Sequence, residues 1–190
     1  GDNGIGVSGA APDADLAGLR LIACGTPDWM EADALSHQDQ IMDIYSNSWG
    51  PYDDGTRLEG PGPLMTAAFE SDVANGRGGL GNIITWAAGN GLDDDDDSNK
   101  DGYANAIETI AVTAITHYGD QSWYAEPGSN ILVAAHSDGD GEGITTTDIE
   151  GNWGYTSNDY TNTFGGTSSA TPLASGVIAL ILEANANLTW

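Results

Sequence analysis

The chain has 190 residues, with 4 lysines and arginines against 29 aspartates and glutamates, so its formal net charge is −25. So acidic a surface repels phosphate backbones and anionic lipids, and we expect no nucleic-acid partner and no membrane binding. Disorder is also excluded, because 39% of the residues are hydrophobic and 6 are tryptophan, which predicts a packed domain.

Two further features narrow the class of protein. The one cysteine, Cys24, excludes a disulfide within the chain and a cysteine-based metal site. The longest apolar run, 177–182, is too short to span a bilayer. With the acidity, the lone cysteine indicates a secreted or periplasmic bacterial protein, of marine or halophilic origin.

Short apolar runs separated by glycines predict strands that alternate with helices. The segments expected as strands are 16–23, 44–48, 82–88, 107–115 and 130–135. Helices are expected over 29–41, 63–75 and 168–184, the last apolar almost all round and therefore buried. The stretches 92–101 and 151–166 are expected as loops. This alternation predicts an α/β fold, a mostly parallel sheet with helices on both faces, in one unit over 1–190.

A cluster of small residues, Gly165-Gly166-Thr167-Ser168-Ser169, precedes the last predicted helix. A serine there is either an N-cap or a nucleophile whose developing charge the helix N-terminus stabilises. A second motif, Ala88-Gly89-Asn90-Gly91, leaves a buried strand at its carboxyl end, where α/β sheets place their ligands. Asn90 in this motif either donates a hydrogen bond to an oxyanion through its side-chain amide or is an ordinary turn residue.

Together these motifs resemble the subtilisin superfamily of serine proteases, and more closely its kexin/furin-like proprotein convertase branch. The resemblance is carried by 44–55, 76–81, 88–91, 101–103, 166–172 and 182–190 and covers essentially the whole chain. It implies a subtilisin-like fold with Ser168 as nucleophile and Asn90 as oxyanion donor. It also implies that Ser48-Trp49-Gly50 pairs with an extended substrate peptide.

The chain departs from that family in its acid–base residues. The mechanism needs a histidine to take the serine proton and an aspartate to orient that histidine. Neither family motif occurs here, and the contexts of His37, His117 and His136 predict surface or packing roles. The chain therefore looks like an incomplete, C-terminal part of the catalytic domain, which alone is inactive.

The acidic residues admit three interpretations. Asp97 to Gly102, followed by Glu108, fits an EF-hand loop, but the expected flanking elements are strands rather than helices. A solvated charge run is the second. The family resemblance gives the third: Asp53, Asp96 and Glu126 bind Ca²⁺, and Asn3 with the carbonyls of Ile5 and Val7 forms part of a second calcium site.

The resemblance also implies the substrate. Asp53 and Asp101 match the acids that hold the basic side chain next to the cut bond. The acids and the tyrosine that line the pocket for a more distant basic residue are matched by Glu31, Glu59 and Tyr103. Paired carboxylates favour arginine through bidentate hydrogen bonds. Asp28 matches a further subsite acid.

The sequence thus predicts a calcium-dependent serine endopeptidase that cuts polypeptides after basic residues, arginine preferred. A prodomain or a downstream β-rich domain is expected elsewhere in the protein. The alternatives are a subtilase of broad specificity and a non-catalytic, calcium-binding scaffold of the same fold.

Overall fold

The computed structural model describes residues 4–190. Its elements in chain order are α1 (Asp28–Leu35), β1 (Ile44–Asn47), α2 (Pro63–Gly79), β2 (Ile83–Ala87), β3 (Thr109–Ile115), β4 (Ile131–His136), β5 (Ile144–Thr147), β6 (Tyr160–Phe164) and α3 (Thr167–Ala184). Two short 3₁₀ turns, Leu92–Asp94 and Ser98–Lys100, lie between β2 and β3.

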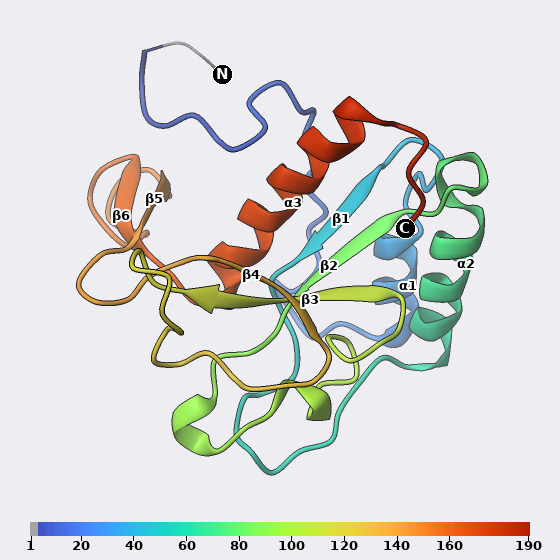
Figure 1. The fold of residues 1–190 in the computed structure, drawn as a ribbon, viewed down its shortest axis with the longest axis horizontal. Helices are drawn as coiled ribbons and strands as arrows, with labels where there is room; N and C mark the ends of the chain where they lie inside the picture. Colours follow the sequence, from blue (N-terminus) through green and yellow to red (C-terminus); the bar gives the residue numbers. More distant parts are fainter. Residues whose placement is uncertain (1–3) are drawn as a thin grey trace.

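The central sheet has the strand order β1-β2-β3-β4, and all its neighbouring strands are parallel. The strands β5 and β6 form a separate antiparallel pair, which Figure 1 shows at the opposite side of the molecule from α2. Because the four central strands are parallel, the loops that follow them emerge at one edge of the sheet. The predicted α/β architecture is confirmed.

Helices cover both faces of the sheet. Ala111 of β3 belongs to a buried cluster with residues of α1 and α2, whereas its neighbours Val112 and Ala114 pack with Ala170 and Ala174 of α3. Successive side chains of a strand point to opposite faces, so one strand serves both layers. Figure 1 shows α3 lying alongside β1 and β2.

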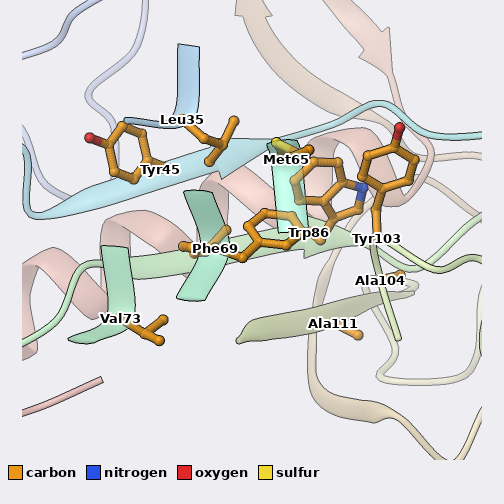
Figure 2. Packing of buried hydrophobic residues seen from close by; sticks show 10 residues of the cluster. Leu35, Tyr45, Met65, Phe69, Val73, Trp86, Tyr103, Ala104 and Ala111 are labelled. Carbon is orange, nitrogen blue, oxygen red and sulfur yellow. The ribbon is translucent and has the colours of Figure 1, made fainter. Parts of the chain in front are cut away.

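The cluster beneath α1 and α2 is built on aromatic rings (Figure 2). Trp86 of β2 is fully buried; its ring stacks on Tyr103 at 5.1 Å and meets Phe69 edge-on at 5.8 Å. Trp49 closes the group, 4.8 Å from Trp86. Such ring pairs add about 0.5–1.5 kcal/mol each to the free energy of burial. The contacts between these rings also hold the ends of β1 and β2 beside the loop that carries Tyr103.

The regular part of α2 ends close to the predicted residue 75, because the backbone leaves helical geometry at Gly76, Arg77 and Gly78. Arg77 has a positive φ of 50°. Its guanidinium forms an ion pair with Asp43 at 3.0 Å and donates to the carbonyls of Ala186 and Leu188. This turn therefore anchors the last residues of the chain against α2.

Two element predictions are wrong. Residues 16–23 form no strand, and Leu16 is 96% exposed; the apolar run lacks a neighbouring strand to pair with among the described residues. The helix predicted over 29–41 ends at Leu35, and Gln38 has a φ of 54°, which cannot continue a right-handed helix.

Two others need correction. The stretch 151–166, predicted as a loop, contains β6. The helix α3 is not buried all round, because Val177, Leu180 and Ile181 are 43–48% exposed. By length and apolar composition α3 could cross a membrane; in this structure its buried side packs on β1 to β4.

Candidate active site

Ser168 is the second residue of α3, and the helix follows a glycine that the turn requires. Gly166 adopts φ 78°, a left-handed conformation that side chains disfavour, and it starts the helix. Ser48, the residue after β1, donates its hydroxyl to the main-chain oxygen of Ser168 at 3.0 Å. The half-buried Ser168 is thus held at a helix N-terminus, where a developing negative charge is stabilised.

Asn90 follows β2 and contacts the same turn. Its side-chain oxygen accepts hydrogen bonds from the amide and the hydroxyl of Thr167, at 2.8 and 3.0 Å. The structure therefore brings Asn90 to the residue that precedes Ser168. Its main-chain N–H donates to Asp53 at 2.8 Å, and its side-chain nitrogen lies 3.4 Å from the same Oδ2 atom.

A support beneath the serine turn was not foreseen in the sequence. Asp138, just beyond β4, accepts a 2.8 Å hydrogen bond from the Gly166 amide and is also bonded by Tyr124. Ser137 donates to the Gly166 carbonyl at 2.7 Å and lies 2.6 Å from the Ser169 hydroxyl. The one sequence signal was the position of Ser137 and Asp138 at the carboxyl end of a predicted strand.

The three histidines lie elsewhere. His37 is exposed in the turn after α1, outside the helix in which we expected it. The His117 ring lies against Tyr118 in a tilted arrangement, 3.9 Å between centroids, and His136, the last residue of β4, directs Nδ1 at the Thr116 carbonyl at 2.9 Å. Within residues 4–190 none of them hydrogen-bonds to Ser168.

An acidic pocket adjoins Asn90. Its lining includes five carboxylates and two cations: Asp53, Asp96, Asp97, Asp101, Glu126, Arg57 and Lys100. Glycines make this crowding possible, because a Cβ on Gly89 would collide with the Glu126 carboxylate and one on Gly91 would press on both Asp53 and Asp96. The predicted metal and specificity acids are therefore neighbours.

The electrostatics of the pocket are unfavourable to so many charges. Burial, together with the nearby charges of Asp53 and Asp96, raises the pKa of Glu126 to about 7, although a hydrogen bond from the Gly91 amide acts in the opposite direction. Burial likewise raises the pKa of Asp101 to about 6. A cation in the pocket would relieve this repulsion.

The donor set suits calcium, a hard cation that takes carboxylate and carbonyl oxygens. Within the described part of the chain, however, no three acidic, histidine or cysteine side chains are gathered to hold one ion. Asp96 faces the ammonium of Lys100 instead, at 3.6 Å. Of the second predicted site, Asn3 lies outside the described residues, and Ile5 and Val7 are exposed.

Of the residues predicted to hold a more distant basic side chain, Glu31 and Tyr103 meet through their side chains, whereas Glu59 contacts this region through its main chain. The Tyr103 hydroxyl donates to Glu31 at 2.9 Å, and Glu31 is only 7% exposed. Glu59 forms a parallel bridge with Asp101, and its carbonyl accepts the Gly102 amide at 2.8 Å. Asp28, by contrast, caps α2 by accepting the amides of Leu64 and Met65.

Comparison with known proteins shows which family has this arrangement. Residues 1–190 match the sequence profile of the Subtilase family. Furin-1 of Xenopus laevis is 42% identical over 191 residues, and furin of Homo sapiens is 41% identical. The chain belongs to the subtilase family. Both alignments cover the whole of this chain, which corresponds to only 24% of the length of Furin-1 and 23% of the length of human furin.

Solved structures of subtilase-type proteases support the same conclusion. The serine protease of Aeromonas sobria, in complex with its chaperone, aligns with a TM-score of 0.84 and 25% identity over 99% of this chain and 39% of that one. A protease of Pseudoalteromonas arctica aligns with a TM-score of 0.78 and 26% identity over 98% of this chain and 56% of that one. The predicted subtilisin-like fold and the resemblance to the furin branch are confirmed.

The fold rules out one interpretation of the acidic loop. The stretch 97–108 lies between β2 and β3 rather than between two helices, so it is not an EF-hand. Asp97 caps the short 3₁₀ turn that follows it, accepting the Asn99 amide at 2.9 Å.

Proposed function

We propose that this subtilase-family chain carries the nucleophile and oxyanion half of a serine endopeptidase that cuts polypeptides after basic residues. One observation supports this most: Asn90 contacts the turn of Ser168 through its side chain and the acid Asp53 through its backbone. A carbonyl held at Ser168 would therefore have an acidic pocket next to it.

In the proposed reaction, the Ser168 hydroxyl oxygen attacks the peptide carbonyl carbon while a general base accepts its proton. The oxyanion of the tetrahedral intermediate is stabilised by the Asn90 amide and by the N-terminus of α3. Cleavage of the C–N bond returns the proton to the leaving amine and leaves an acyl-enzyme on Ser168, which water hydrolyses. The base and its aspartate partner come from a part of the protein outside residues 1–190.

Specificity in this proposal follows from the acids. Asp53 and Asp101 hold the basic side chain next to the cut bond, and Glu31, Glu59 and Tyr103 take a more distant one. A guanidinium can bond two carboxylates at once, whereas a lysine ammonium satisfies fewer acceptors, so arginine is preferred. Ser48, Trp49 and Gly50, which follow β1, align the substrate backbone.

Calcium is the proposed cofactor. Asp53, Asp96 and Glu126 would hold one ion, and Asn3 with the carbonyls of Ile5 and Val7 a second. The chemistry it supplies is charge neutralisation beneath the specificity pocket, which leaves Asp101 as the freer anion for a substrate arginine. The excess of carboxylates around Glu126 favours this assignment.

A non-catalytic scaffold is the second candidate, favoured by the absence of a histidine at Ser168 within residues 4–190. A broad-specificity subtilase is the third. For the whole protein we propose a prodomain or a β-rich domain in addition to this chain. We also propose a location outside the cytoplasm, where a lone cysteine and a net charge of −25 suit a saline, bacterial setting.

Active-site labelling separates enzyme from scaffold. A fluorophosphonate should label the full-length protein at Ser168, and Ser168→Ala should abolish the labelling. Asn90→Ala should slow it about a hundredfold or more, the cost of one oxyanion donor. Absence of labelling in a folded full-length protein would favour the scaffold.

A further inference from the structure

Lys100 is the one lysine of the chain, and it lines the acidic pocket. It lies 3.6 Å from Asp96 Oδ1, and it donates to the carbonyls of Gly55 and Asp95, each at 3.3 Å. Its side chain is 34% exposed and that of Asp96 is 11% exposed, so the pair is partly shielded from water. A partly buried pair of this kind interacts more strongly than a surface ion pair.

The three groups that contact the ammonium lie on two different loops. Gly55 belongs to the loop after β1, which carries Asp53; Asp95 and Asp96 belong to the loop after β2. The loops touch at Gly55, which has a φ of 67° and no room for a Cβ against the Asp94 carbonyl. Lys100 therefore joins the two loops through carbonyl and carboxylate oxygens, the donor set that a calcium ion would use.

We propose that Lys100 is a built-in cation of the acidic pocket, which holds the two loops together and competes with calcium for Asp96. This inference rests on the calcium part of the proposed function. Of the other charged groups that line the pocket, Asp53, Asp97, Asp101 and Glu126 are acids and Arg57 is a cation. Arg57 is engaged by Asp54 at 2.7 Å, so Lys100 is the cation at Asp96.

Competition has a measurable consequence. When Lys100 bonds Asp96, a calcium ion must displace the ammonium before it gains that carboxylate, so calcium affinity is lowered and the calcium-free loops are stabilised. Removing the charge should reverse both effects. The test uses the full-length protein in a Ser168→Ala background, which prevents self-cleavage, and compares it with Lys100→Met, which keeps the aliphatic chain. Arg20→Gln, which removes an exposed charge from outside the pocket lining, is the matched control.

Calcium affinity is measured by titration calorimetry, and thermal unfolding is followed with chelator and with calcium, at constant ionic strength. We expect Lys100→Met to bind calcium about tenfold more tightly and to melt several degrees lower in chelator, with the loss restored by calcium. Arg20→Gln should match the parent in both measurements.

Equal calcium affinities in Lys100→Met and the parent would overturn the inference, and so would a lower melting temperature that calcium does not restore. If neither protein binds calcium at millimolar concentration, the inference fails together with the calcium assignment. Cleavage after arginine by the Ser168-containing protein would still stand in that case, so the two failures are distinguishable.

Discussion

Asp138 and Gly166 join the end of β4 to the turn that presents Ser168. The carboxylate of Asp138 accepts the Gly166 amide at 2.8 Å, and Gly165 has no room for a Cβ because the same carboxylate packs against it. The backbone ahead of the serine is therefore fixed from below by a charge-assisted hydrogen bond. Asp138 is a positioning residue, because its contacts are to the turn and to Tyr124.

We predict that Asp138→Ala lowers kcat of the full-length enzyme about tenfold or more with little change in KM. The variant should also lose about 1–3 kcal/mol of stability, because the Gly166 amide and the Tyr124 hydroxyl lose a charged acceptor. Asp138→Asn retains one acceptor oxygen and should keep most of the activity. Peptidase kinetics and urea unfolding check both variants; an Asp138→Ala enzyme with the parent kcat contradicts the positioning role.

A second buried acid serves the fold rather than the site. Asp72 of α2 is completely buried, and within residues 4–190 neither of its carboxylate oxygens has a hydrogen-bond partner. Burial raises its pKa to about 7, with a further contribution from the charge of Asp39. In the folded protein the neutral form is favoured, so this group costs no stability below pH 4. The cost grows as the pH rises towards 7, because the unfolded chain ionises first.

Asp72→Asn should therefore stabilise the protein at neutral pH, since the amide carries no charge at any pH. We expect the gain over the parent to be roughly 2 kcal/mol larger at pH 8 than at pH 5. Urea denaturation at the two values measures it. An equal gain in stability at both pH values would show that Asp72 is ionised in the folded state at both, or that its pKa is the same in the folded and the unfolded protein.

Glu31 is the candidate acid for a basic residue farther from the cut bond. Glu31→Gln should lower kcat/KM about tenfold on peptides with such a residue and hardly change it on peptides without one, because the charge but not the Tyr103 hydrogen bond is lost. Asp33→Asn, an exposed acid on the same helix, is the control. Equal losses on both peptide sets would assign Glu31 to the fold instead.

The positions of the histidines give a further prediction. Residues 1–190 expressed alone should show no fluorophosphonate labelling of Ser168 at the rate of an intact protease, because an unaided serine hydroxyl stays protonated at neutral pH. Rapid labelling would mean that His37, His117 or His136 reaches Ser168 in an arrangement different from this structure.

Sequence patterns predicted elements well where burial on both sides leaves a continuous apolar run. The five residues of β2 are all buried, and the glycines and Asn90 that follow mark its end. The run at 16–23 is similar in composition but lies exposed, because pairing depends on a neighbouring strand that local pattern does not reveal. The positive φ of Gln38, which follows the end of α1, was also not predicted from the sequence.

The candidate site was predicted through motifs, whereas its supports were not. Ser168, Asn90 and the pocket acids stand in recognisable patterns. Asp138, Ser137 and Lys100 act through contacts between loops that are distant in the chain, and no spacing rule predicts such contacts. The partnerless carboxylate of Asp72 is equally invisible, because a polar residue in a helix normally faces water.

In the proposed function, Asp53 and Asp101 select a basic residue for cleavage at Ser168. The most direct test is kcat/KM of the full-length enzyme on matched peptides that differ only in arginine, lysine, leucine or phenylalanine before the cut bond. We predict that arginine exceeds lysine and that both exceed leucine and phenylalanine by several orders of magnitude, because a site of buried charges rejects side chains that leave them unpaired. Asp101→Asn should reduce cleavage after arginine far more than hydrolysis of a small ester. Comparable values for arginine and leucine would contradict the claim and leave a subtilase of broad specificity.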